Sequence, residues 1–214
     1  DTKHPIIMEN LLGIKRVKGS NQKAKKPILI NDLKLIINVI DQTNQTEKRK
    51  IRDKAIILIG FSGGFRRSEL VHLIYDDVEF VNEGVKIFIK RSKTDQSGEG
   101  MTKAIPYFDN QSFCPVISLK NWMNNSEIKS GKIFDISDKS IALIIKKYAS
   151  LSGLDPNKYS GHSLRSGFAT STAESGAEER NIMAMTGHKT SQMVRRYIQE
   201  ANLFKNNALN KIKF

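Results

Sequence analysis

The chain has 214 residues, 39% of them hydrophobic, and a formal net charge of +13 at pH 7. This length suits one domain with a sizeable core or two small ones, and the hydrophobic share argues against wholesale disorder. A charge this positive attracts polyanions, so nucleic acid is the first expected partner and an anionic membrane surface the second. The sequence has no apolar run long enough for a transmembrane helix and no signal-peptide pattern in its first residues, so we expect a soluble, cytoplasmic protein.

The single cysteine and the first residue add two expectations. Cys114 cannot form an internal disulfide or a cysteine-rich zinc site, and we interpret it as a small buried side chain at the start of a helix. The chain begins at Asp1 and not at a methionine, which indicates a processed product or a part of a longer protein.

The first segment, residues 11–26, is basic, poor in signals of regular structure and free of acidic residues. We interpret residues 1–26 as a flexible arm or interdomain linker over DNA, with tentative DNA contacts at Lys15, Arg16 and Lys18. A solvated linker whose charges bind nothing specific is an equally good interpretation.

Three helices are predicted next. Residues 32–41 place apolar side chains at helical spacing, and residues 47–59 end in an apolar block. Gly60, Gly63 and Gly64 are expected to break the second helix. A third helix is predicted to begin near Arg66.

The only convincing β region follows. Residues 78–81 and 85–89 alternate apolar and polar side chains about a hairpin turn, and a third short strand is predicted over residues 102–107. Lys93 would then lie at the tip between the second and third strands.

The remainder reads as helical, so we predict a mainly α fold with one small three-stranded antiparallel sheet, in the α+β class. An apolar stripe at 203–212 ends the chain. The helices predicted in this part span residues 114–123, 137–151, 162–172, 177–185 and 191–199.

A phenol among basic residues is the first chemical feature. Tyr197 follows two arginines, and His188 lies upstream beside a Gly187 that can end the preceding helix. A phenol has an ordinary pKa of about 10, so as a nucleophile it needs a base or nearby positive charge. Taken alone, such a tyrosine is typical of a packing residue.

Two arginines could supply that positive charge. A phosphodiester under attack gains negative charge on its non-bridging oxygens, and the planar guanidinium groups of Arg66 and Arg165 can bind both. His162 shares a helix face with Arg165, and Glu69 lies where it could orient Arg66. The sequence lacks a phosphate-binding glycine-lysine loop, paired cysteines and an acidic cluster with metal-ligand spacing, so we expect chemistry without metal or cofactor.

These motifs occur in one order along the chain: Gly-Phe-Arg-Arg-Ser-Glu-Leu at 64–70, Ser-Lys-Thr at 92–94, His-x-x-Arg at 162–165, Gly-His at 187–188 and a tyrosine at 197. Together they resemble the tyrosine site-specific recombinases and phage-type integrases over residues 27–214. The resemblance implies the catalytic-domain fold of that family and an active site of Arg66, Lys93, His162, Arg165, His188 and Tyr197.

The resemblance also implies a mechanism and an assembly. Tyr197 would attack a phosphate of double-stranded DNA to form a 3′-phosphotyrosyl bond, while Lys93 protonates the departing 5′ oxygen; neither metal nor ATP is needed. The histidines would donate to the phosphate or move the tyrosine proton. Residues 27–200 would be the catalytic domain, residues 201–214 a candidate segment for exchange between subunits, and the working form a homotetramer on DNA that can be monomeric when free. The resemblance also implies a nucleoid-associated protein of bacterial or phage-like type.

Two alternatives stay open at this point. A type IB topoisomerase uses closely similar chemistry, and a non-catalytic DNA-binding module would share the charge but not the reaction. Further tentative DNA contacts are Lys90, Arg91, Lys146 and Lys147. The sequence does not decide between phage integration, mobile-element transposition and chromosome dimer resolution, nor does it give the DNA target.

Overall fold

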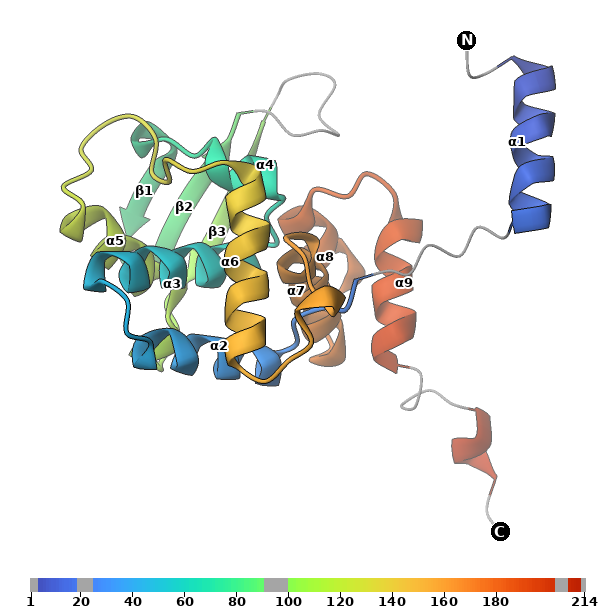
Figure 1. Ribbon diagram of the computed structural model, residues 1–214. Helices are drawn as coiled ribbons and strands as arrows, with labels where there is room; N and C mark the ends of the chain where they lie inside the picture. The colour runs from blue at the N-terminus through green and yellow to red at the C-terminus, as the bar shows by residue number, and fades with distance from the viewer. Residues whose placement is uncertain (1–3, 19–24, 91–99, 203–207, 213–214) are drawn as a thin grey trace.

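A computed structural model describes residues 4–18, 25–90, 100–202 and 208–212 (Figure 1). Within these ranges the chain is mostly helical, with one antiparallel sheet in the order β1-β2-β3, so the predicted class is confirmed. No helix in the described ranges has the length and apolar character needed to cross a membrane. The helices are α1 (Pro5–Lys18), α2 (Ile30–Gln42), α3 (Glu47–Ser62), α4 (Arg67–Val71), α5 (Pro115–Asn125), α6 (Asp138–Leu151), α7 (His162–Glu174), α8 (Glu179–Thr186) and α9 (Ser191–Asn202).

The sheet matches the predicted strands closely. β1 (Val78–Val81) pairs with β2 (Gly84–Ile89), and β2 pairs with β3 (Met101–Pro106). Side chains alternate along a strand, so Val85, Ile87 and Ile89 of β2 all face the core. The same alternation in β3 buries Lys103 together with Ile105, which brings a charged side chain into the interior.

Helix α3 is the central buried helix and continues past the point where we expected it to break. Gly60 lies within the helix, and Gly63 is its C-cap. A Cβ at Gly60 would lie 2.9 Å from Leu164 Cδ1 and 3.0 Å from Leu70 Cδ1. The prediction of a break is therefore wrong for Gly60, which lies inside the helix and allows α4 and α7 to pack closely on α3. It is confirmed for Gly63, where the helix ends.

Helices α7, α8 and α9 pack on one another beside the sheet-containing part (Figure 1). Their shared core is small and consists of Ala169, Ala173, Ile182 and Val194. The half-buried ring of Tyr197 packs against this core, so the position of the phenol depends on the packing of α9 against α7 and α8.

Helix α1 differs from the expected irregular arm. Pro5 suits the first turn of a helix, and the segment carries several apolar side chains, including Ile7, Leu11 and Ile14, which are exposed. The prediction of an irregular arm rested on the basic residues and did not account for this apolar content. Arg16 is exposed, whereas the side chains of Lys15 and Lys18 lie outside the described part.

The segment that precedes α2 is fastened to the start of α7. The backbone N–H of Lys26 donates to Lys158 O at 2.7 Å, and that of Ile28 donates to Ser163 O at 2.9 Å. Ile28 is fully buried, and the Lys26 ammonium lies 3.1 Å from Asp32 Oδ2. These bonds hold residues 25–28 beside His162.

Gly167→Ala should destabilise the protein, although alanine ordinarily stabilises a helix by about 1 kcal/mol relative to glycine. The new Cβ would lie 2.0 Å from Ile28 O and 2.8 Å from Ile28 C, so the docked segment must move. We expect a loss of about 1–3 kcal/mol, as for an overpacked core, and a melting temperature lower by several degrees. Gly13→Ala is the matched control, because a Cβ there meets nothing within 4 Å. Equal melting temperatures for the two variants would contradict the docking of residues 25–28.

Candidate active site

The turn between α3 and α4 presents Arg66. Gly64 has φ +55°, and a Cβ there would lie 3.0 Å from Phe168 Cδ1, so the position requires glycine. Arg66 Nη1 donates to Glu69 Oε1 at 2.6 Å, and the Arg66 backbone N–H donates to Glu69 Oε2 at 2.9 Å. Because the Glu69 side chain is buried, this double contact fixes the guanidinium in place, as the spacing suggested.

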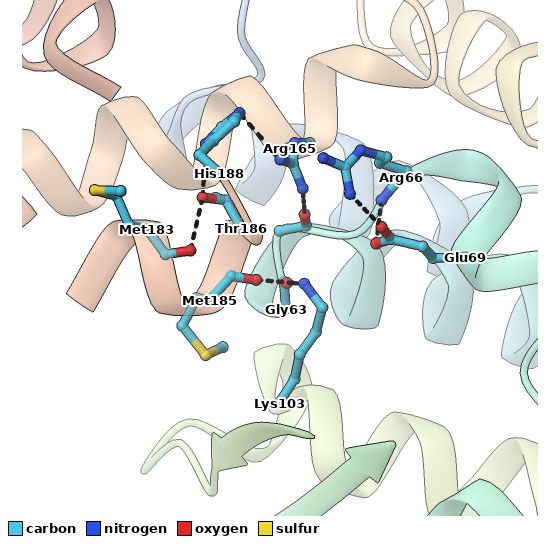
Figure 2. A network of polar contacts seen from close by, with 10 residues as sticks. Gly63, Arg66, Glu69, Lys103, Arg165, Met183, Met185, Thr186 and His188 are labelled. Atoms are coloured by element: carbon cyan, nitrogen blue, oxygen red, sulfur yellow. Dashed lines mark hydrogen bonds and ion pairs between the residues drawn. The ribbon is translucent and has the colours of Figure 1, made fainter. Parts of the chain in front are cut away.

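Arg165 lies on α7 and is buried, with an exposed fraction of 1%. Its Nη1 donates to Gly64 O at 2.9 Å, and its Nη2 lies 3.0 Å from His188 Nε2. Burial, and then the charge of Arg66, lower the pKa of Arg165 to about 10, so it stays protonated at neutral pH. Two guanidinium groups therefore lie together (Figure 2), an arrangement that suits a doubly coordinated anion.

The hydrogen bonds of His188 define its tautomer. Arg165 can only donate, so His188 Nε2 must accept and carries no proton. The proton is then on Nδ1, which donates to Thr186 Oγ1 at 2.7 Å (Figure 2). Thr186 is fully buried and donates in turn to Ile182 O at 2.6 Å. This chain of bonds points Nε2 into the site.

His188 is neutral at physiological pH in this arrangement. Burial is the main cause, followed by the charges of Arg165 and Arg66, and together they lower the pKa of His188 to about 4. The unfolded chain binds a proton near pH 6.5 and the folded chain only near 4, so this residue makes stability fall as pH falls through that interval.

His162 begins α7 at the surface of the site. Partial burial, and then the positive charges of Arg165, Arg66 and Arg67, lower the pKa of His162. A neutral imidazole that faces solvent can accept a proton.

Tyr197 and His162 line the same hollow, of about 1010 Å³, together with Lys26, Lys158 and Arg196. The Tyr197 ring centroid lies 6.1 Å from that of His188, with 34° between the ring planes. The hollow thus has a basic rim and the phenol in its wall.

The structure brings together most of the predicted site. Arg66, Arg165, His162, His188 and Tyr197 converge from the α3–α4 turn, α7, the residues after α8, and α9. Lys93 lies outside the described residues, so its placement in the site stays a prediction.

The tentative DNA contacts are more scattered. Lys90 pairs with Asp77 at 2.9 Å, and Lys147 donates to Gln45 at 2.6 Å near the end of α6 that is remote from α4 (Figure 1). Lys146 is next to Lys147 on α6, and Arg91 lies outside the described part. DNA binding by these residues stays a prediction.

Sequence reasoning missed two residues of the site. Thr186 carried no signal, because a threonine before a glycine is ordinary. Lys103 did carry one: in the predicted third strand it shares a face with Ile105, and that face is the buried one.

Thr186→Val should disturb His188 while nearly preserving the side-chain shape. The variant removes the acceptor of the Nδ1 proton, and a buried unsatisfied N–H costs about 1–3 kcal/mol. We expect the histidine ¹⁵N spectrum of wild type to show an Nδ1–H tautomer that becomes mixed in Thr186→Val. Thr186→Ser, which retains the hydroxyl, is the control. An Nε2–H tautomer in wild type would contradict the assignment.

Comparison with known proteins shows the family of this chain. The model of the Phage integrase family matches residues 28–203, and the chain belongs to that family. Its fold, mostly helical with a small antiparallel sheet, is that of tyrosine recombinase catalytic domains.

Relatives and solved structures agree with this assignment. An integrase/recombinase xerD homolog of Selenomonas ruminantium is 44% identical over 222 residues, which cover 98% of this chain and 64% of the relative. A tyrosine recombinase of Agathobacter rectalis is 30% identical over 75% of this chain and 51% of its own length. The crystal structure of XerH recombinase in a post-cleavage complex with difH substrate superposes with a TM-score of 0.69 at 20% identity, covering 88% of this chain and 57% of XerH. The chain thus spans about half to two thirds of the length of these relatives.

Proposed function

We propose that this chain is the catalytic part of a site-specific DNA recombinase or integrase that breaks and rejoins strands through a 3′-phosphotyrosyl intermediate. The observation that carries the proposal is the convergence of two fixed guanidinium groups, two neutral imidazoles and one phenol from four separate parts of the chain. Family membership supports the same conclusion.

The arginines would bind the scissile phosphate. Arg165 is held by Gly64 O and His188, and Arg66 by Glu69, so both groups are oriented before DNA arrives. Fixed donors aimed at developing charge lower a barrier without reorganisation. Charge stabilisation by these side chains is why we propose a reaction without metal or cofactor.

The transfer itself is a transesterification. Tyr197 Oη attacks phosphorus as its proton passes to neutral His162, and the bond from phosphorus to the 5′ oxygen breaks. That oxygen leaves as a hydroxyl after accepting a proton, for which Lys93 is the predicted donor. A 5′ hydroxyl of the partner strand then attacks the phosphotyrosyl bond and regenerates Tyr197. The number of phosphodiester bonds in the DNA is therefore unchanged.

We propose double-stranded DNA as the partner and a homotetramer as the working assembly. The net charge of +13 supports the first part, and affinity should fall steeply with salt. The solved relatives include XerH with its difH substrate and a lambda integrase dimer bound to a COC′ core site, each with the same fold. The segment 203–212, which carries an apolar stripe, is the predicted exchange segment, and its Leu209 and Ile212 are exposed.

The test is to trap the covalent intermediate. The protein is incubated in EDTA with a pool of DNA duplexes of randomised sequence that each carry one nick, denatured in detergent, and examined for DNA attached to protein. We expect an adduct whose DNA is joined through its 3′ end, so 3′ exonuclease is blocked and 5′ exonuclease is not. Attachment through a 5′ end, or nicking without attachment, would overturn the proposal. Exchange of strands between two duplexes separates a recombinase from a topoisomerase, which only relaxes supercoils.

A further inference from the structure

Lys103 is a buried cation beneath the site that the proposed reaction does not use. It has no exposed surface, which is rare for lysine. Its Nζ donates to Gly63 O at 2.8 Å and to Met185 O, and it lies 4.7 Å from the centroid of the Phe65 ring. The ammonium group thus donates to two backbone carbonyls and lies over an aromatic ring.

The two carbonyl groups belong to the segments that present the phosphate-binding side chains. Gly63 immediately precedes Gly64, whose carbonyl accepts from Arg165. Met185 immediately precedes Thr186, which holds His188. Figure 2 shows the Lys103 amine between these two segments, with the guanidinium groups above.

We propose that Lys103 is a positioning residue that locks the α3–α4 turn to the end of α8 and so sets the spacing of the groups that bind phosphate. The effect on catalysis rests on the proposed function. The effect on anion binding does not, because the same groups would bind any tetrahedral anion in the site. Lys103 also ties both segments to β3, the strand that follows the predicted catalytic Lys93.

The electrostatics support this role. Burial lowers the pKa of Lys103 to about 7, with Glu69 opposing the shift and Arg165 and Arg66 adding to it. His188 also faces this charge. Above pH 7 the amine becomes neutral and its hydrogen bonds weaken, whereas a bound anion favours the ammonium form. Anion binding and protonation of Lys103 should therefore reinforce each other.

The experiment compares wild type with Lys103→Met and uses inorganic sulfate as the probe. Sulfate keeps its charge between pH 6 and 9, so a pH dependence of its affinity reports the protein. Lys86→Met is the matched control: Lys86 lies on the neighbouring strand β2, is exposed and pairs with Glu79. Sulfate binding is followed by NMR titration, and folding by circular dichroism.

In wild type we expect sulfate affinity to fall as pH rises, with a midpoint at or above about 7. His162 and His188 titrate lower, so neither produces this midpoint. Lys103→Met should bind sulfate at least about ten-fold more weakly at pH 6.5 and lose the pH dependence, while Lys86→Met behaves as wild type. A Lys103→Met protein with the wild-type affinity and pH curve would overturn the proposal.

Folding failure is also decisive. Lys103→Gln retains two N–H donors without the charge. If Lys103→Met and Lys103→Gln are both unfolded, then Lys103 is needed for folding and the positioning role is refuted. The rate of adduct formation is a second, independent measurement. Lys103→Met should slow cleavage more than ten-fold at equal DNA occupancy. If wild type forms no adduct but shows the sulfate behaviour, the proposed function fails while the role of Lys103 stands.

Discussion

Tyr197→Phe should abolish covalent attachment to DNA, with a loss of at least about 10⁴-fold, and leave DNA binding within a factor of about three. The phenylalanine ring keeps the packing of α9 against the small core of α7 and α8. Only the nucleophilic oxygen is lost, and no other described tyrosine lines the hollow. The measurement is adduct yield from nicked duplexes, with binding followed in parallel by fluorescence anisotropy.

Tyr75→Phe is the matched control. Tyr75 is exposed and lines a separate hollow with residues of α5 and β1 that contains none of the predicted site residues. Its variant should form adduct at the wild-type rate. An adduct that persists in Tyr197→Phe would show that another residue is the nucleophile. Loss of binding together with the adduct would mean that Tyr197 acts through the fold.

The elements of the fold were largely predictable because their signals are local. Alternation about a hairpin turn predicted β1 and β2, and the apolar periodicity of residues 32–41 predicted α2, which runs from Ile30 to Gln42. Gly187 was expected to end a helix and does so with φ +65°. Gly60 was misread, since the neighbours that require a glycine there, Leu70 and Leu164, come from other helices.

The sequence predicted a candidate site as a set of residues and not as a network. The order of motifs singled out Arg66, Arg165 and His188 as candidates, but no pattern in the sequence predicts that Arg165 contacts His188. That contact joins residues 23 apart in sequence, and the bond to Gly64 joins residues 101 apart. Lys103 shows the same limit, because its face could be inferred while its two carbonyl acceptors depend on how α8 packs against the α3–α4 turn.

Arg165→Lys should lower the rate of adduct formation by about 10²–10³-fold, although the positive charge is kept. The planar guanidinium contacts Gly64 O, His188 and, in the proposed reaction, phosphate at the same time. A lysine ammonium is a compact charge on a flexible stem and cannot span these acceptors in one plane. Single-turnover kinetics at saturating DNA measure the loss directly.

Arg180→Lys separates this effect from a general change of arginine to lysine. Arg180 lies on α8 with its side chain 82% exposed and pairs with Glu178, so its replacement should leave the rate unchanged. The reason for the loss also predicts a second signature: without the Nη2 donor, His188 Nε2 has no fixed partner and its tautomer should become mixed. A wild-type rate in Arg165→Lys would mean that charge alone is sufficient at this position. A slow variant with an unchanged His188 tautomer would instead place the whole effect at the phosphate, independent of the contact between the two side chains.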